Sequence, residues 1–208
     1  MTAKDHNPAS PSGFSLTGLC AGFDDSVQQS QQIFRRVLTA LSEPGTVQEL
    51  LVGPSPEGVN LASYHLCLAL LDADTSLWIT PSLRVSGLES ALRFHCGCRL
   101  VATPGEADFA LITADFDGDL SRFNQGSHEY PDRSTTVIVQ VESLQVAENW
   151  TLSGPGIDGH RRVGMTGLDR RWPSMLQANH ARFPCGTDLI FTAGTALMGL
   201  PRTTLVEV

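Results

Sequence analysis

Hydrophobic residues along positions 25–42 repeat with the spacing of an amphipathic helix. Val27, Phe34, Val37, Leu38 and Leu41 recur at steps of three, four or seven residues, which places them on one face of a helix. We therefore predict a helix over 25–42 with these side chains buried.

Special residues mark both ends of this helix. Asp24 or Asp25 can cap the first turn with a carboxylate. Pro44 ends the helix, because proline has no backbone N–H and keeps Glu43 out of helical dihedral angles. Gly45 then allows the chain to turn into the strand-like segment 46–52.

Three further segments have helical patterns. They are 60–72, with Asn60 as a candidate cap, 87–96, and 168–183, with Pro173 near its first turn. A short helix is also predicted within 116–126.

Apolar runs between these helices have the length of strands. The clearest is 135–141, which is rich in β-branched residues. The last two strands, 188–194 and 196–208, are predicted to flank a tight Ala-Gly-Thr turn. The other predicted strands are 76–80, 99–102, 108–113, 150–157 and 161–165.

The order of these elements indicates an α/β fold. Strands and helices alternate over the first 130 residues, and strands dominate afterwards. This order favours a three-layer α/β/α sandwich with a mixed sheet. We expect one domain over 23–208, preceded by a flexible tail over 1–22 that is rich in Ser, Pro, Gly and Asn.

Composition narrows the function classes. The first 13 residues contain no apolar signal segment, and runs such as 66–71 are far too short to span a bilayer. We therefore expect a cytoplasmic protein with no membrane partner. The net charge of −8 argues against nucleic-acid binding but leaves room for a local arginine site for a small anion.

Lysine is almost absent from this chain. Lys4, in the polar tail, is its only lysine. A Schiff base with a cofactor or a phosphate-binding loop needs an ordered lysine in a pocket. We therefore expect neither chemistry, and no cofactor.

Two motifs are weak matches to known binding sites. Gly154, Gly156 and Gly159 follow the G-x-G-x-x-G pattern, but the residues after them are strand-like, whereas a dinucleotide site needs a helix there. We favour a glycine-rich loop. The alternating Asp115, Asp117 and Asp119 resemble a calcium loop but lack its glutamate at the twelfth position, so we favour a solvated turn.

The five cysteines do not form a recognisable framework. Their number is odd, and the pair Cys96 and Cys98 beside His95 has no second ligand pair, so we expect no metal site. Cys185 with a histidine could in principle form a nucleophilic pair, but an inert buried thiol is the simpler interpretation.

Arg202 is followed by two threonines near the C-terminus. An arginine beside hydroxyl groups suits a phosphate or carboxylate ligand. It also suits a subunit interface, in which arginine is enriched, or a simple surface ion pair. The sequence leaves these three interpretations open.

Three blocks of the chain resemble the H subunit family of bacterial phosphonate metabolism. They are FRRVLTALSEPG at 34–45, LRFHCGCRLV at 92–101, and the C-terminal block 183–208, which contains FPCGTDL and PRTT. Weaker similarity joins them, so the resemblance covers 23–208. The Ser/Pro-rich leader and the two cysteines Cys96 and Cys98 depart from the family pattern.

The resemblance implies a fold similar to the large domain of pyridoxal-phosphate-dependent aminotransferases, without the cofactor. It implies a core component of the carbon–phosphorus lyase complex, together with the G, I and J subunits, and a homodimer in isolation. The reaction implied for the complex joins ATP and methylphosphonate and releases adenine, giving α-D-ribose 1-methylphosphonate 5-triphosphate. The resemblance places the nucleosidase-like chemistry on the I subunit and the radical cleavage on the J subunit. It assigns no catalytic residue to the family of this chain.

Two hypotheses follow. In the first, the chain is an essential, non-catalytic subunit of this complex. In the second, it binds a phosphonate or nucleotide, or acts on it, through a cluster of arginines and histidine. The candidate ligand-binding or interface residues are Arg35, Arg36, Glu43, Arg93, His95, Arg202, Thr203 and Thr204. A degenerate vitamin B6 binder is a third, separate class.

Overall fold

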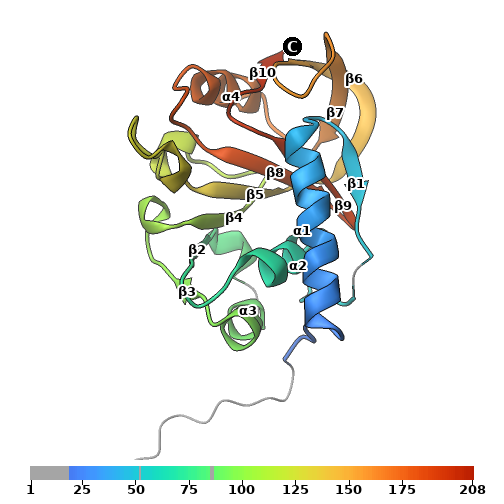
Figure 1. Ribbon diagram of the computed structural model, residues 1–208, viewed down its shortest axis with the longest axis vertical. Helices are drawn as coiled ribbons and strands as arrows, with labels where there is room; N and C mark the ends of the chain where they lie inside the picture. The colour runs from blue at the N-terminus through green and yellow to red at the C-terminus, as the bar shows by residue number, and fades with distance from the viewer. Residues whose placement is uncertain (1–18, 52, 85–86) are drawn as a thin grey trace, which may run out of the picture.

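A computed structural model describes residues 19–51, 53–84 and 87–208 of the chain (Figure 1). Its centre is a seven-stranded mixed sheet with the strand order β1-β9-β8-β5-β4-β2-β3. Strands β8, β5, β4, β2 and β3 are parallel, whereas β9 and β1 complete one edge in antiparallel fashion. The strands are β1 (Val47–Glu49), β2 (Ser76–Ile79), β3 (Arg99–Leu100), β4 (Phe109–Thr113), β5 (Thr136–Gln140), β8 (Asp188–Ala193) and β9 (Ala196–Leu200).

Different elements cover the two faces of this sheet. One face carries three helices, α1 (Ser26–Ser42), α2 (Leu61–Leu70) and α3 (Leu88–Cys96). The other carries helix α4 (Trp172–His180) and an antiparallel sheet of order β10-β6-β7. The strands of this small sheet are β6 (Ser143–Ser153), β7 (Arg161–Thr166) and β10 (Leu205–Glu207). The described structure also contains short 3-10 turns at Pro81–Leu83, Pro104–Glu106, Leu120–Arg122 and Pro131–Arg133.

The central strands are apolar on both faces, and this creates two hydrophobic cores. Because successive strand residues point to opposite faces, Leu111 and Ile138 pack beneath the three helices. Their neighbours Ile112 and Val139 pack against α4 and the small sheet. The continuous apolar runs of the sequence are thus those of parallel strands covered on both sides.

The predicted α/β class with a mixed sheet is confirmed. The predicted α/β/α layering is only partly correct. The layer opposite α1, α2 and α3 is not purely helical, because β6, β7 and β10 share it with α4. The predicted strand 196–208 is wrong in its extent: β9 ends at Leu200, and a turn in which the Thr204 N–H bonds to the Pro201 carbonyl redirects the chain to the small sheet. The candidate leader falls mostly on 1–18, outside the described residues.

The N-terminal cap of α1 is confirmed. Its predicted buried face is confirmed at Val37 and in part at Leu41, but it is wrong for the other three residues. The Asp25 carboxylate accepts a hydrogen bond from the Gln28 N–H, as expected of a cap. The buried residues are Ile33, Val37 and Ala40, whereas Phe34 is 47% exposed. Val27 and Leu38 are exposed as well. The helix carries two apolar stripes, and the buried one is rotated from the predicted one by about 100°.

A glycine on β9 determines which stripe is buried. A Cβ atom on Gly199 would lie 2.5 Å from the carbonyl oxygen of Ala40, closer than real side chains approach. The absence of a side chain there lets the backbone of α1 rest on β9 and turns Ala40, with Val37, toward the sheet.

We expect Gly199→Ala to lower the free energy of unfolding by about 1–3 kcal/mol, because the added methyl group forces α1 away from β9. Urea denaturation measures this change. Gly105→Ala is the matched control, since its Cβ would lie 3.5 Å from the nearest atom, an ordinary contact. Equal stability of the two variants would contradict the close approach.

A buried histidine supports the segment that follows β1. His65, on α2, is 1% exposed. Its Nε2 accepts from the Gly53 N–H at 3.1 Å, so its Nδ1 carries the proton and donates to the Leu61 carbonyl at 2.9 Å. Burial lowers the pKa of His65 below its ordinary value of 6.5, and the bond to Leu61 opposes this effect.

This histidine predicts a loss of stability in mild acid. The unfolded chain binds its proton at a higher pH than the folded protein, so the contribution of neutral His65 is complete above about pH 6.5 and is lost as the pH falls below that value. We expect His65→Gln, which cannot titrate, to weaken the fall in unfolding free energy between about pH 7.5 and pH 5.5. Parallel pH profiles from urea denaturation of the two proteins would rule out this role.

No helix in the described ranges is long and apolar enough to cross a membrane.

Candidate functional site

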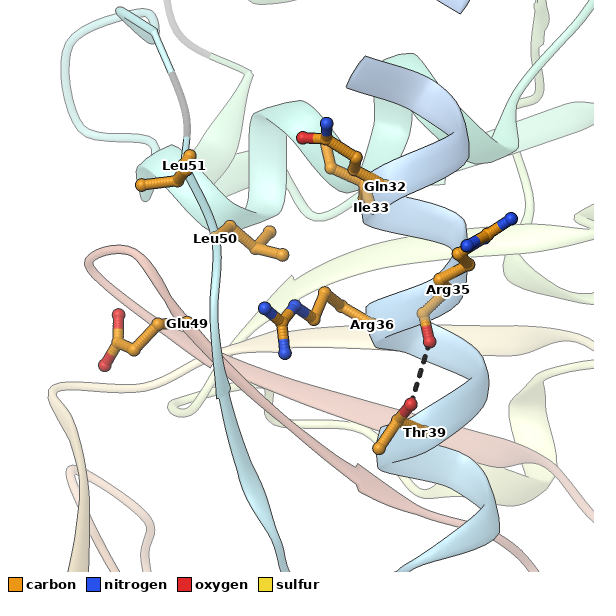
Figure 2. Close-up of a pocket in the computed structure, with 8 residues that line it drawn as sticks. All are labelled: Gln32, Ile33, Arg35, Arg36, Thr39, Glu49, Leu50 and Leu51. Carbon is orange, nitrogen blue, oxygen red and sulfur yellow. Dashed lines mark hydrogen bonds between the residues drawn. The ribbon is translucent and has the colours of Figure 1, made fainter. Parts of the chain in front are cut away.

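A groove between α1 and β1 brings together two of the candidate residues (Figure 2). Its volume is about 280 Å³. Arg35 and Arg36 line it from the helix, and Glu49 lines it from the strand. The remaining lining residues are Gln32, Ile33, Thr39, Leu50 and Leu51.

The two arginines leave this groove with uncommitted positive charge. Arg36 extends toward β1, where its Nη1 donates to the Gln48 side-chain oxygen at 3.3 Å. The exposed Arg35 side chain points away from β1 (Figure 2). Within the described part of the chain, no ion pair to either Arg35 or Arg36 is present. The Glu49 carboxylate accepts instead from the Thr195 hydroxyl at 2.9 Å. Guanidinium groups without a carboxylate partner, beside apolar walls, suit an anionic group carried on a larger ligand.

Arg93 and His95 lie elsewhere, on α3. Both are exposed. The His95 Nε2 lies 3.0 Å from the Cys20 carbonyl oxygen, and its ring meets Phe94 edge to face. His95 therefore helps to hold the segment before α1 and borders a separate hollow with Val27.

Four of the five thiols lie in the region of α2, α3 and the segment before α1. Burial raises the pKa of Cys96 to about 12 and that of Cys67 well above its usual value. Burial also raises the pKa values of Cys20 and Cys98. These thiols stay protonated near neutral pH and are poor nucleophiles. No group of three metal-ligating side chains with suitable geometry occurs among the described residues.

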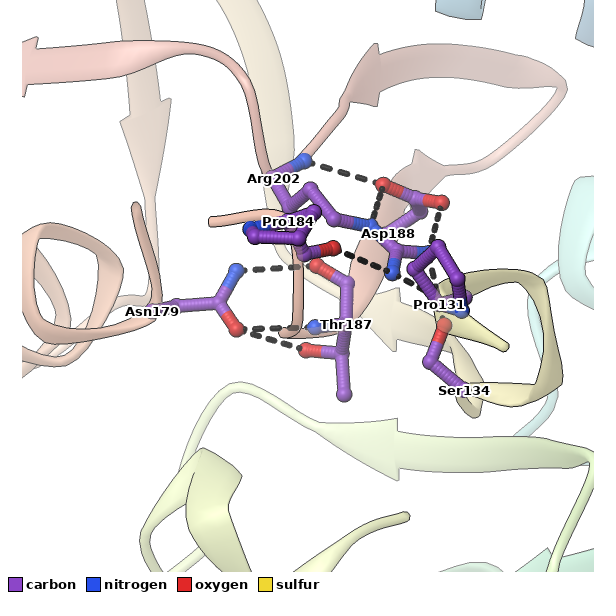
Figure 3. A network of polar contacts seen from close by, with 7 residues as sticks. All are labelled: Pro131, Ser134, Asn179, Pro184, Thr187, Asp188 and Arg202. Carbon is purple, nitrogen blue, oxygen red and sulfur yellow. Dashed lines mark hydrogen bonds and ion pairs between the residues drawn. The ribbon is translucent and has the colours of Figure 1, made fainter. Parts of the chain in front are cut away.

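Arg202 forms a closed polar network (Figure 3). Its Nε and Nη2 donate to the two carboxylate oxygens of Asp188 at 3.0 and 2.7 Å, and its Nη2 also donates to the Ser134 hydroxyl at 2.6 Å. Its Nη1 donates to the Pro131 and Pro184 carbonyls at 2.7 and 3.4 Å. A guanidinium has five N–H donors, so this one is fully used within the protein.

The remaining candidates have no common target. Thr203 borders the shallow hollow over the Arg202 network, whereas the buried Thr204 hydroxyl has no partner within the described structure. Glu43 follows α1 and holds it through its backbone, whose N–H bonds to the Thr39 carbonyl. The eight candidates thus fall into separate neighbourhoods: Arg35 and Arg36 line one groove, and Arg202 and Thr203 line another hollow.

Sequence comparison connects this fold to known proteins. The sequence model of the family described as bacterial phosphonate metabolism protein (PhnH) matches residues 21–207. The chain belongs to this family. A relative from Rhizobium meliloti (strain 1021), named alpha-D-ribose 1-methylphosphonate 5-triphosphate synthase subunit PhnH, is 36% identical over 188 residues, covering 89% of this chain and 94% of the relative. A second relative, from Stutzerimonas stutzeri and provisionally named C-P lyase subunit protein HtxG, is 29% identical over 180 residues, which is 86% of each chain.

The resemblance read from the three sequence blocks is thereby confirmed. The glycine motif of this PhnH family member lies in the turn between β6 and β7, as its strand-like context predicted. The prediction of a buried Cys185 thiol is wrong: Cys185 is half-buried, and its Sγ lies 3.8 Å from the His128 Nδ1. The sequence left a pairing of Cys185 with a histidine open, but it could not identify His128, because the two residues lie far apart in the sequence and in loops.

The network around Arg202 predicts a structural role for this residue. We expect Arg202→Ala to lower the free energy of unfolding by about 2–4 kcal/mol, because it leaves Asp188 and two loop carbonyls without their donor. The exposed Arg170, replaced by alanine, is the control and should change stability by less than about 0.5 kcal/mol. Urea denaturation compares the two, and an Arg202→Ala variant as stable as its control would contradict the structural role.

Proposed function

We propose that this chain is an essential subunit of the carbon–phosphorus lyase core complex in phosphonate breakdown. In that role it supports the formation of α-D-ribose 1-methylphosphonate 5-triphosphate from ATP and methylphosphonate, without supplying catalytic residues. The proposal rests on the match of residues 21–207 to the PhnH family and on the synthase for which the Rhizobium relative is named as a subunit.

The arrangement of polar residues supports a non-catalytic role. A catalytic centre needs a nucleophile or a base held within hydrogen-bond reach of its partners. The candidate arginines and His95 are dispersed, and Arg202 is saturated within its own network. In the described structure, Cys185 and His128 have no third group on the histidine's other nitrogen to orient it.

The surface supports a role in assembly. Val27, Phe34 and Leu38 form an exposed apolar stripe along α1, in which Val27 is 77% exposed. Large apolar side chains exposed together on one element are typical of protein–protein contact sites.

Several finer statements belong to the same proposal. The partners are the G, I and J subunits, and the complex acts in the cytoplasm. Residues 23–208 form one domain, and the isolated chain forms a homodimer. We also infer that the fold corresponds to the large domain of pyridoxal-phosphate-dependent aminotransferases. The lack of any lysine beyond Lys4 supports a form of that fold without the cofactor.

A ligand-binding role is the alternative, and one observation favours it. Arg35 and Arg36 share a groove without an ion-pair partner in the described structure. A phosphonate or nucleotide bound there would make the chain a binding subunit of the same complex.

Co-expression with the G, I and J subunits from the same host tests the main proposal. We expect stoichiometric co-elution in size exclusion, with the mass of the complex including this chain, and loss of the triphosphate product when the chain is left out. Full product formation by the G, I and J subunits alone would overturn the essential role. Product formation by this chain alone would overturn the non-catalytic one.

A further inference from the structure

The free edge of β1 and the arginine groove beside it form one surface. Strand β1 is the last strand of the seven-stranded sheet, so no strand lies beyond it in the described structure. The groove that contains Arg35 and Arg36 opens between this edge and α1.

The hydrogen-bond pattern shows which backbone groups of β1 are free. The Leu50 N–H donates to the Thr195 carbonyl at 3.0 Å, toward the neighbouring strand β9. In an antiparallel pair, alternate residues direct their N–H and C=O groups to the same side. Gln48 therefore also faces β9, whereas Val47 and Glu49 direct their backbone groups outward.

The side chains along this edge are equally open to a partner. Val47 is 38% exposed, and Leu51 at the end of the strand has almost its full surface in solvent. A sheet edge that exposes apolar side chains can pair with extended segments of other chains. Proteins therefore usually protect such an edge with charged residues or proline, or cover it. The edge of β1 has neither a lysine nor a proline within 46–51 to discourage such pairing.

The charge beside this edge selects the kind of segment that fits. Leu50 and Gln48 face α1, since Leu50 packs in the core beneath the helices and Gln48 meets Arg36. Side chains directly opposite one another on paired strands lie on the same face of the sheet. An added strand would therefore direct alternate side chains into the groove, against Arg36, where an Asp or Glu is favoured.

We propose that β1 accepts an extended segment of another core subunit as an eighth strand, with an acidic side chain of that segment held by Arg36. Backbone hydrogen bonds to Val47 and Glu49 supply affinity, and the carboxylate in the groove supplies specificity, as in other cases of strand addition. This inference rests on the proposed function, because it names the surface by which the subunit joins the complex.

Binding of the full-length chain to the purified assembly of the G, I and J subunits tests the proposal. We expect the variant Arg36→Glu to bind at least about tenfold more weakly than the wild type, because the introduced carboxylate would repel the acidic side chain of the partner. The matched control is Arg99→Glu, an exposed charge reversal on β3 at the opposite edge of the sheet, which should bind like the wild type.

Amide hydrogen exchange tests the backbone contacts without any substitution. We expect slower exchange at Val47 and Glu49 in the complex than in the free chain, because only the outward N–H groups gain a partner. As a second variant, Val47→Pro removes one outward donor and keeps the pairing with β9, since edge strands tolerate proline where the N–H faces solvent. It should bind more weakly while keeping the thermal midpoint within a few degrees.

Three results would overturn the proposal. The first is equal binding by the wild type and the Arg36→Glu variant, with unchanged exchange at Val47 and Glu49. The second is loss of self-association rather than of complex formation, which would make a second copy the occupant. The third is binding of ATP or methylphosphonate in calorimetry that depends on Arg36, which would make the groove a small-anion site. If the wild type bound no other subunit at all, the proposed function itself would fail.

Discussion

The position of the helical layer depends on the close approach of α1 to β9 at Gly199. Because position 199 has no side chain, the carbonyl of Ala40 can rest on the strand. This contact sets the height and the rotation of α1 over the sheet. It buries Ile33 and Val37, and it leaves Arg36 on the side that faces β1. The groove is therefore a consequence of helix packing, not of a separate loop.

Polar residues are used in two contrasting ways in this molecule. Around Arg202, every guanidinium donor has a partner, so the residue joins β8, the 131–134 turn and the loop after α4 into a rigid unit. Beside β1, two arginines have no carboxylate partner in the described structure. A saturated network stabilises the fold, whereas unpaired charges at an open edge are available to a partner. The distinction separates a structural arginine from candidate interface arginines of the same chemical type.

Much of the fold could be read from local patterns. The end of α1 near Pro44, the strand at 135–141 and the loop at the glycine motif all depend on backbone preferences that act over a few residues. The buried face of α1 could not be read in this way, since the helix has two apolar stripes and their spacing is equally regular. The division of 196–208 between two sheets was missed for a related reason: Val206 continues the apolar pattern, but the strand with which it pairs lies far away in the sequence.

The sequence by itself determined the α/β class and the family, because composition, block order and periodicity are properties of the chain alone. Only the tertiary structure decided which candidate residues meet. Arg35, Arg36, His95 and Arg202 have the same side-chain chemistry wherever they lie, and their roles depend on neighbours brought by long-range strand pairing and helix packing. Asp188 reaches Arg202 because β8 and β9 pair, and Gln48 reaches Arg36 because α1 rests on the sheet.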